Sequence, residues 1–113
     1  MGLQSLRPEN GLSQEYIRES VANTFLAQVA NPAEAFPRLK GWANANGYDL
    51  DGDESAGRFA GTPSGFAGAL IGRITGTYQV AGNLVTIRSD KNLPAGAVAN
   101  ALSQFGMTLV RSG

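Results

Sequence analysis

The sequence predicts an α+β domain in which two N-terminal helices and a C-terminal helix pack on one face of an antiparallel sheet. The central observation is an alternation of apolar and polar residues over residues 69–89, which is typical of strands with one buried face. The pair Gly82-Asn83 interrupts this alternation as a two-residue hairpin turn does. Apolar residues recur at helical spacing on both sides of the region. The length of 113 residues suffices for one domain with its own core.

The hairpin at Gly82-Asn83 has a register that the turn and the hydrophobic pattern predict independently. A two-residue turn places Val80 opposite Val85 and Tyr78 opposite Ile87. Both pairs are apolar, so the two strands present one common buried face.

The N-terminal part of the chain is expected to begin with a flexible arm over residues 1–12, which lack hydrophobic periodicity. Residues 13–113 are expected to form the single domain. Its first helix is predicted over about residues 13–30 because apolar residues recur there every four positions. This apolar stripe consists of Ile17, Val21, Phe25 and Val29.

A second helix is predicted from Asn31-Pro32, an N-cap residue followed by proline at the first helical position. Pro37 lacks an amide hydrogen, so a kink or a fresh helix start is expected there. The helix is expected to end near Asn46-Gly47. Its Trp42 is interpreted as a core residue between this helix and the sheet.

The predicted sheet is a meander over about residues 57–89, beginning with a short strand centred on Phe59. The turn at residues 62–65 is predicted to close a hairpin in which Phe59 faces Gly68. The chain then turns through residues 90–92 and forms a helix over about residues 95–105, which Gly106 ends. The sheet has three strands, or four if residues 107–110 add an edge strand.

The composition argues against an enzyme. The chain contains neither cysteine nor histidine, which removes disulfides, thiol nucleophiles, imidazole chemistry and most zinc sites. Residues 61–65 do not match a phosphate-binding loop, and Ser64 lies in no nucleophile elbow. We therefore expect no catalysis, no cofactor and no metal. A cytoplasmic location is expected, because no signal peptide and no membrane-spanning run is visible.

The charges divide unevenly along the chain although the formal net charge is zero. Residues 1–54 carry eight acidic and four basic side chains, whereas residues 55–113 carry one acidic and five basic side chains. Two explanations stay open: attraction between the halves within one fold, or head-to-tail association between copies.

An acidic stretch at residues 48–54 resembles part of a calcium loop. Asp49, Asp51 and Asp53 have the one-three-five spacing of calcium ligands. The twelfth position is Ala60, where such a loop needs a bidentate glutamate. The stretch is interpreted as a solvated turn in which Asp51-Gly52 reverses the chain, with weak cation binding as the alternative.

The outer face of the predicted sheet carries three arginines among threonines. Nucleic-acid binding is not expected, because Phe59 and Tyr78 point inward and cannot stack on bases. A protein partner, either the same chain or another, fits the mixed charges better. The candidate interaction residues are Arg58, Arg73, Arg88, Asp49, Asp51 and Asp53.

The inner face of the same sheet carries glycines every four residues. Bare backbone of this kind meets a close neighbour, which is either a helix of the same fold or an apolar ligand. The candidate apolar-ligand face consists of Gly68, Gly72, Gly76, Tyr78 and Trp42. The predicted function is therefore a non-catalytic protein-interaction or self-assembly module, and the alternative is a small carrier that binds an apolar molecule over the glycines.

Overall fold

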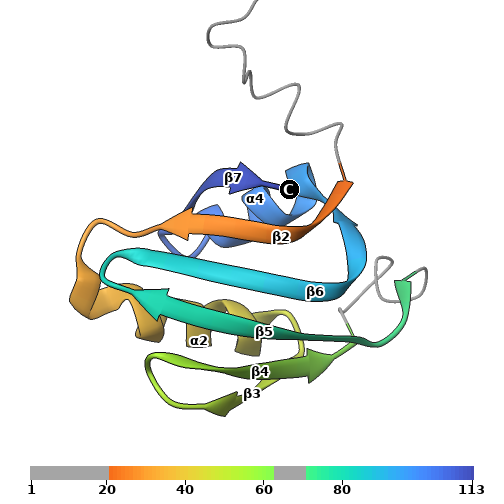
Figure 1. The fold of residues 1–113 in the computed structure, drawn as a ribbon, viewed down its shortest axis with the longest axis horizontal. Helices are drawn as coiled ribbons and strands as arrows, with labels where there is room; N and C mark the ends of the chain where they lie inside the picture. The colour runs from red at the N-terminus through yellow and green to blue at the C-terminus, as the bar shows by residue number, and fades with distance from the viewer. Residues whose placement is uncertain (1–20, 63–70) are drawn as a thin grey trace, which may run out of the picture.

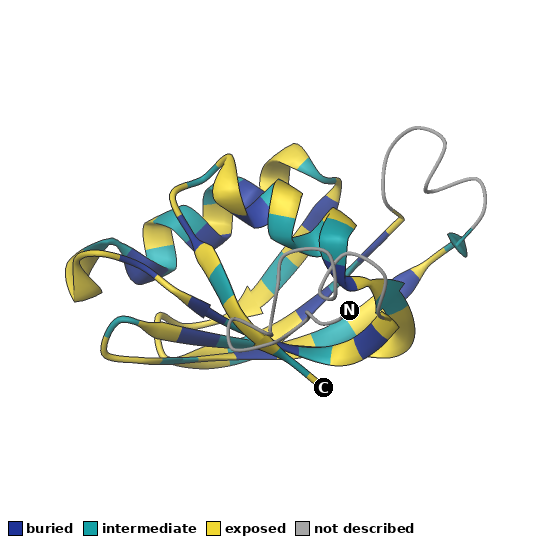
Figure 2. Ribbon diagram, turned by 90° about the horizontal axis from the view of Figure 1, so that it is seen from above, coloured by how far each residue is buried: buried dark blue, intermediate teal, exposed yellow. Residues whose placement is uncertain are grey.

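The computed structural model describes residues 21–62 and 71–113 as a two-layer α+β fold. In these residues one antiparallel sheet has the strand order β3-β4-β5-β6-β2-β7, and two α-helices cover one of its faces (Figures 1 and 2). The elements in chain order are β2 (Val21–Gln28), the 3₁₀ helix η1 (Pro32–Glu34), α2 (Ala35–Ala45), β3 (Tyr48–Gly52), β4 (Ala56–Gly61), β5 (Ile74–Ala81), β6 (Leu84–Pro94), α4 (Ala95–Ser103) and β7 (Thr108–Ser112).

The predicted hairpin is confirmed as β5 and β6. Val80 pairs with Val85 and Tyr78 with Ile87. Gly82 has a φ of 61°, the left-handed conformation that a tight hairpin turn requires. Strand β4 precedes this hairpin and pairs with β5, so the predicted antiparallel meander of β4, β5 and β6 is confirmed as well.

Strand β2 occupies residues where the sequence predicted a helix. The prediction is wrong for residues 21–28, which lie between β6 and β7 in the sheet, and the remaining residues 13–20 lie outside the described part. Burial in β2 alternates from Thr24 to Gln28, where Phe25 and Ala27 are fully buried. The register shift between Ala22 and Thr24 reverses the alternation before that point, so Ala22 is buried and Val21 is 62% exposed. The four-residue spacing behind the helix prediction is also an even number, so it is equally compatible with one face of a strand.

The register between β4 and β5 differs from the predicted one. Phe59 pairs with Gly76 and Gly61 pairs with Ile74, so the predicted pairing of Phe59 with Gly68 is wrong. The prediction assumed that the turn at residues 62–65 joins consecutive strands directly. The chain instead passes through a longer connection before β5 begins at Ile74, and residues 63–70 of this connection lie outside the described part.

The second predicted helix is confirmed, with a fresh start near Pro37. The side chain of Asn31 accepts a hydrogen bond from the Ala33 amide and caps η1. Helix α2 then begins at Ala35, which leaves Pro37 in the first turn, where its missing N–H costs no helical hydrogen bond.

The C-terminal part keeps its predicted elements but not the predicted turn. Helix α4 ends before Gly106, whose φ is 76°, and β7 forms a strand at the edge of the sheet. The turn expected at residues 90–92 is wrong, because β6 continues to Pro94. Its register against β2 shifts between Ala22 and Thr24, so residues 89–92 form a bulge rather than the end of the strand.

The core lies between the helices and the inner face of the sheet, and an aromatic cluster forms part of it. The ring centroid of Trp42 lies 5.2 Å from that of Tyr48 and 6.0 Å from that of Phe59. This confirms the position of Trp42 between helix and sheet. No helix within residues 21–62 and 71–113 has the length and apolar character needed to cross a bilayer.

Candidate functional site

The most extended candidate surface is the sheet face opposite to α2 and α4, here called the open face. No helix or strand within the described residues covers it (Figure 2). Its side chains are those that alternate with the buried ones along each strand. They include Asp49, Asp51, Arg58, Thr75, Thr77, Gln79, Thr86, Arg88, Asp90, Leu26 and Arg111.

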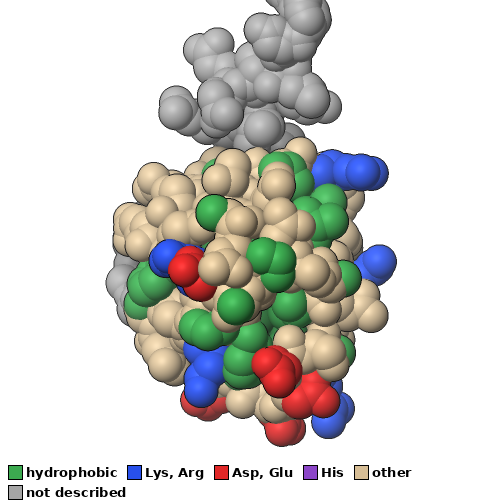
Figure 3. Space-filling view, turned by 90° about the vertical axis from the view of Figure 1, so that its left-hand side faces the viewer, with side chains coloured by type: hydrophobic (Ala, Val, Ile, Leu, Met, Phe, Trp, Pro, Cys, Tyr) green, Lys and Arg blue, Asp and Glu red, His purple; other side chains and the backbone are tan. Residues whose placement is uncertain are grey.

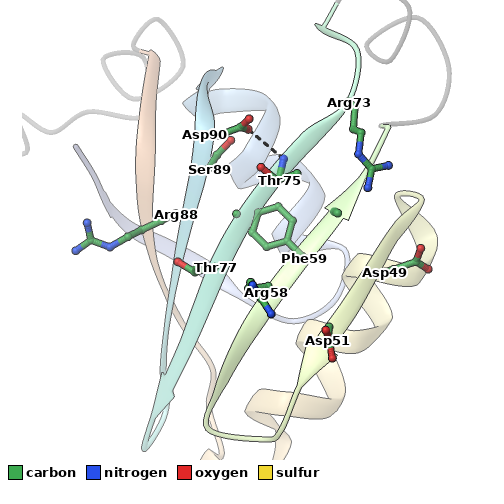
Figure 4. Close-up of a pocket in the computed structure, with 12 residues that line it drawn as sticks. Asp49, Asp51, Arg58, Phe59, Arg73, Thr75, Thr77, Arg88, Ser89 and Asp90 are labelled. Atoms are coloured by element: carbon green, nitrogen blue, oxygen red, sulfur yellow. Dashed lines mark hydrogen bonds between the residues drawn. The ribbon is translucent and has the colours of Figure 1, made fainter.

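A hollow of about 730 Å³ lies on this face between β3 and β6 (Figure 4). One row of cross-strand partners runs through it: Asp51 pairs with Arg58, Arg58 with Thr77, and Thr77 with Arg88. Arg73, just before β5, also lines the hollow. The three arginines that the alternation predicted on one face therefore do share one surface, and Asp49 and Asp51 join them there.

No direct ion pair with another described residue neutralises the charges of the open face. Within the described residues, the salt bridge below 4.0 Å is that of Glu34 with Arg38 on the helix side. Asp90 uses its carboxylate differently, since Oδ1 accepts a hydrogen bond of 3.0 Å from the Thr75 amide. Among the described residues, Arg58 and Arg88 thus have no acidic side chain within 4.0 Å.

The acidic stretch is divided between a strand and a turn. Residues 48–52 form β3, so the predicted chain reversal at Asp51-Gly52 is wrong, and the turn lies at residues 53–55. Oδ1 of Asp53 accepts hydrogen bonds from the Ser55 hydroxyl and from the Ser55 and Ala56 amides. These bonds stabilise the carboxylate and hold the pKa of Asp53 below its ordinary value.

This division separates Asp53 from the aspartates of the open face. In the described part of the chain, no group of three or more acidic side chains is placed to hold a metal ion. The one-three-five spacing does not indicate a calcium site here, because alternate residues of a strand point to one face and do not converge on a single ion.

Among the inner glycines that the structure describes, Gly76 lies against a side chain of the same fold. A Cβ atom on Gly76 would lie 2.5 Å from Cζ of Phe59, so the phenylalanine ring covers this glycine. Gly72 lies before β5 with a φ of 79°, and Gly68 is outside the described residues. Tyr78 and Trp42 are buried in the core, with 1% and 6% of their surface exposed.

A smaller apolar cavity lies between α2, α4 and the sheet, where the sequence did not indicate one. Its volume is about 110 Å³, and Trp42, Tyr48, Ile74, Val98 and Ala101 are among its lining residues. The Tyr48 hydroxyl makes no hydrogen bond to a described residue, and burial raises the pKa of this tyrosine. The sequence signal for this cavity is weak, because its lining comes from five separate elements.

Large exposed hydrophobic side chains are scattered rather than gathered. Figure 3 shows the end of the molecule that carries the β5–β6 turn, where hydrophobic side chains are interrupted by polar atoms. In the described residues, the exposed large side chains are Val21, Leu84 and Val110, on three different strands. No single apolar patch of the described residues therefore competes with the open face as a candidate surface.

The candidate interaction residues named from the sequence leave out four polar residues that line the hollow: Thr75, Thr77, Ser89 and Asp90. The alternation along residues 69–89 already placed the threonines beside the arginines, so the signal was present.

Comparison of the chain with protein-family models, with curated proteins and with solved structures found no match.

Proposed function

We propose that this protein is a non-catalytic interaction or self-assembly module that binds a protein partner through the open face of its sheet. The observation that carries the proposal is this broad face, uncovered by the described residues, whose arginines and aspartates make no direct ion pairs with one another. The absence of histidine and cysteine from the whole sequence supports a role without catalysis.

The size of the open face fits a protein partner. Six strands at about 4.8 Å spacing are about 24 Å across, and a strand of eight residues is about 26 Å long. The resulting area of about 600 Å² approaches the roughly 800 Å² that each partner contributes to a standard interface. An antiparallel sheet can also face water on one side, so the area alone does not require a partner.

The charges support specificity more than affinity. Exposed ion pairs across an interface chiefly set orientation and the rate of association, while affinity comes from desolvated apolar contacts. The apolar side chains of the open face include Leu26, Leu84 and the alanines at positions 56, 60 and 81. Weak, salt-sensitive association is therefore the behaviour that this face supports.

Sedimentation of the purified protein over a range of concentrations, at low and high salt, tests the proposal. We expect association that weakens as salt rises, because exposed charges are screened. Arg58→Asp should weaken it further, whereas Lys40→Glu on α2 makes the same change in net charge away from the face. Chemical unfolding of both variants checks that the fold persists. A strict monomer at both salt concentrations, with no partner recovered from native extract, would contradict the proposal.

The alternative function, a small carrier, is favoured by one observation: the apolar cavity of about 110 Å³, which Tyr48 helps to line. Sites for drug-sized ligands measure roughly 300–1,000 Å³, so the cavity suits only a much smaller molecule. Phenol is a suitable probe because it combines an apolar ring with a hydroxyl. Saturable quenching of Trp42 fluorescence by phenol, abolished by the cavity-filling change Val98→Phe, would favour the carrier.

A further inference from the structure

We propose that the partner of the open face is a second copy of this chain, stacked face to face about a two-fold axis that runs parallel to the strands. The inference rests on the proposed function and names its partner. It follows from the distribution of charge across the sheet, which is acidic at one edge and basic at the other.

The acidic edge is β3. Asp49 and Asp51 are both exposed on this strand, while Leu50 between them turns toward the core. Their pairing partners on β4 are Ala60 and Arg58, so both aspartates belong to the open face.

The basic edge is β7, at the other end of the strand order. Arg111 pairs with Leu26 of β2, whose neighbours Phe25 and Ala27 are both fully buried on the helix side. Arg111 therefore lies on the open face. Neither β2 nor β7 contains an acidic residue, so nothing on these strands offsets its charge.

A two-fold axis parallel to the strands reverses the strand order of one copy over the other. It places β3 of each copy over β7 of its partner and β5 over β6, because the axis passes through the middle of the six strands. Asp51, the nearer of the two aspartates, then approaches Arg111 of the partner, and the contact occurs twice in the dimer. An axis perpendicular to the strands would stack β3 on β3 and β7 on β7, which sets like charges against each other.

The positions along the strands permit this contact. Asp51 lies in one row of cross-strand partners, which continues through Arg58, Thr77 and Arg88 to Thr24 of β2. Arg111 pairs with Leu26, which lies two residues farther along β2 than Thr24. Two residues of a strand correspond to about 7 Å, a distance that the long arginine side chain bridges. The centre of the interface would join the threonines of β5 to Arg88 of the partner.

Charge reversal tests the arrangement in solution. Asp51→Arg and Arg111→Asp, each made alone, should weaken self-association about tenfold, because two exposed ion pairs per dimer become repulsive. An equimolar mixture of the two variants should associate within about threefold of the unchanged protein, since every contact in the mixed dimer again joins opposite charges. Glu54→Arg and Lys40→Glu are the controls with matched changes of net charge outside the open face.

Sedimentation equilibrium of each variant and of the mixture gives the dissociation constants, and chemical unfolding confirms that each variant is folded. Recovery in the mixture together with unaffected controls supports the two-fold stack. Self-association that persists without sensitivity to these changes overturns the stack and leaves an interaction module with another contact surface. A monomer at all concentrations overturns the second copy as partner, and the partner search from native extract then decides the proposed function separately.

Discussion

Strand β2 offers the sharpest test of the fold, because a helix and this strand, with its register shift between Ala22 and Thr24, make opposite predictions for two of its residues. In the structure Ala27 is fully buried and Val21 is 62% exposed. A helix with the apolar stripe Val21, Phe25 and Val29 would bury Val21 and turn Ala27 toward solvent. Replacing each residue by aspartate therefore distinguishes the two arrangements.

The expected cost of Ala27→Asp follows from its burial. Protonating an ordinary aspartate at pH 7 costs about 4 kcal/mol, because its pKa of about 3.9 lies three units lower. Fitting a larger side chain into a packed site adds about 1–3 kcal/mol. The sum approaches the whole stability of a small domain, about 5–15 kcal/mol. Val21→Asp changes an exposed position and should alter the free energy of unfolding by about 0.5 kcal/mol or less.

The milder pair Ala27→Ser and Val21→Ser keeps the measurement within range. A hydroxyl buried at position 27 should cost about 1–3 kcal/mol, while the exposed change stays close to zero. Urea unfolding followed by the fluorescence of Trp42, the single tryptophan, reports both values. A greater loss of stability from Val21→Asp than from Ala27→Asp would refute β2 as a strand in this register.

Four further outcomes are expected. Val85→Asp should destabilise by several kcal/mol and Thr86→Asp hardly at all, because only Val85 is fully buried; equal losses in urea unfolding would contradict the face assignment. The Tyr78 hydroxyl donates a 2.7 Å hydrogen bond to the Asp53 carbonyl, so Tyr78→Phe should cost about 0.5–1.5 kcal/mol. Burial and the charges of Asp53 and Asp51 raise the pKa of Tyr78, so stability should fall as pH rises above about 10, and less steeply in Tyr78→Phe. Calorimetric titration with calcium should detect no micromolar binding; such binding, lost in Asp51→Asn, would refute this.

The candidate site was predictable in part. Alternation along the strands predicts that the arginines lie on the outer face, and the structure places Arg58, Arg73 and Arg88 around one hollow. The same alternation does not place Asp49 and Asp51 beside them. An acidic stretch with a glycine is typical of a turn, and only the pairing of β3 with β4 brings these carboxylates onto the same face.

The apparent separation of charge along the chain shows the same limit. The sequence divides into an acidic and a basic half, yet the sheet sets Asp51 directly opposite Arg58. Strand pairing joins residues by their position in the ladder and not by their position in the chain. The polarity that remains runs across the sheet, from β3 to β7, and is visible only once the strand order is known.

Elements that depend on local information were predictable from the sequence alone. A two-residue turn and a period of two specify the β5–β6 register, Asn31 with Pro32 specifies a helix start, and Gly106 specifies a helix end. Each depends on residues within a few positions of one another.

For residues 21–28, the choice between helix and strand depends on tertiary contacts. A spacing of four serves both periods, and alanine at positions 22 and 27 is accepted on either face, so the local pattern does not choose. Hydrogen bonding to β6 on one side and β7 on the other makes the choice, and both partners lie more than 50 residues away along the chain. The Phe59–Gly76 pairing also depends on tertiary contacts. The residues of a long connection do not indicate which positions of the two strands pair with each other.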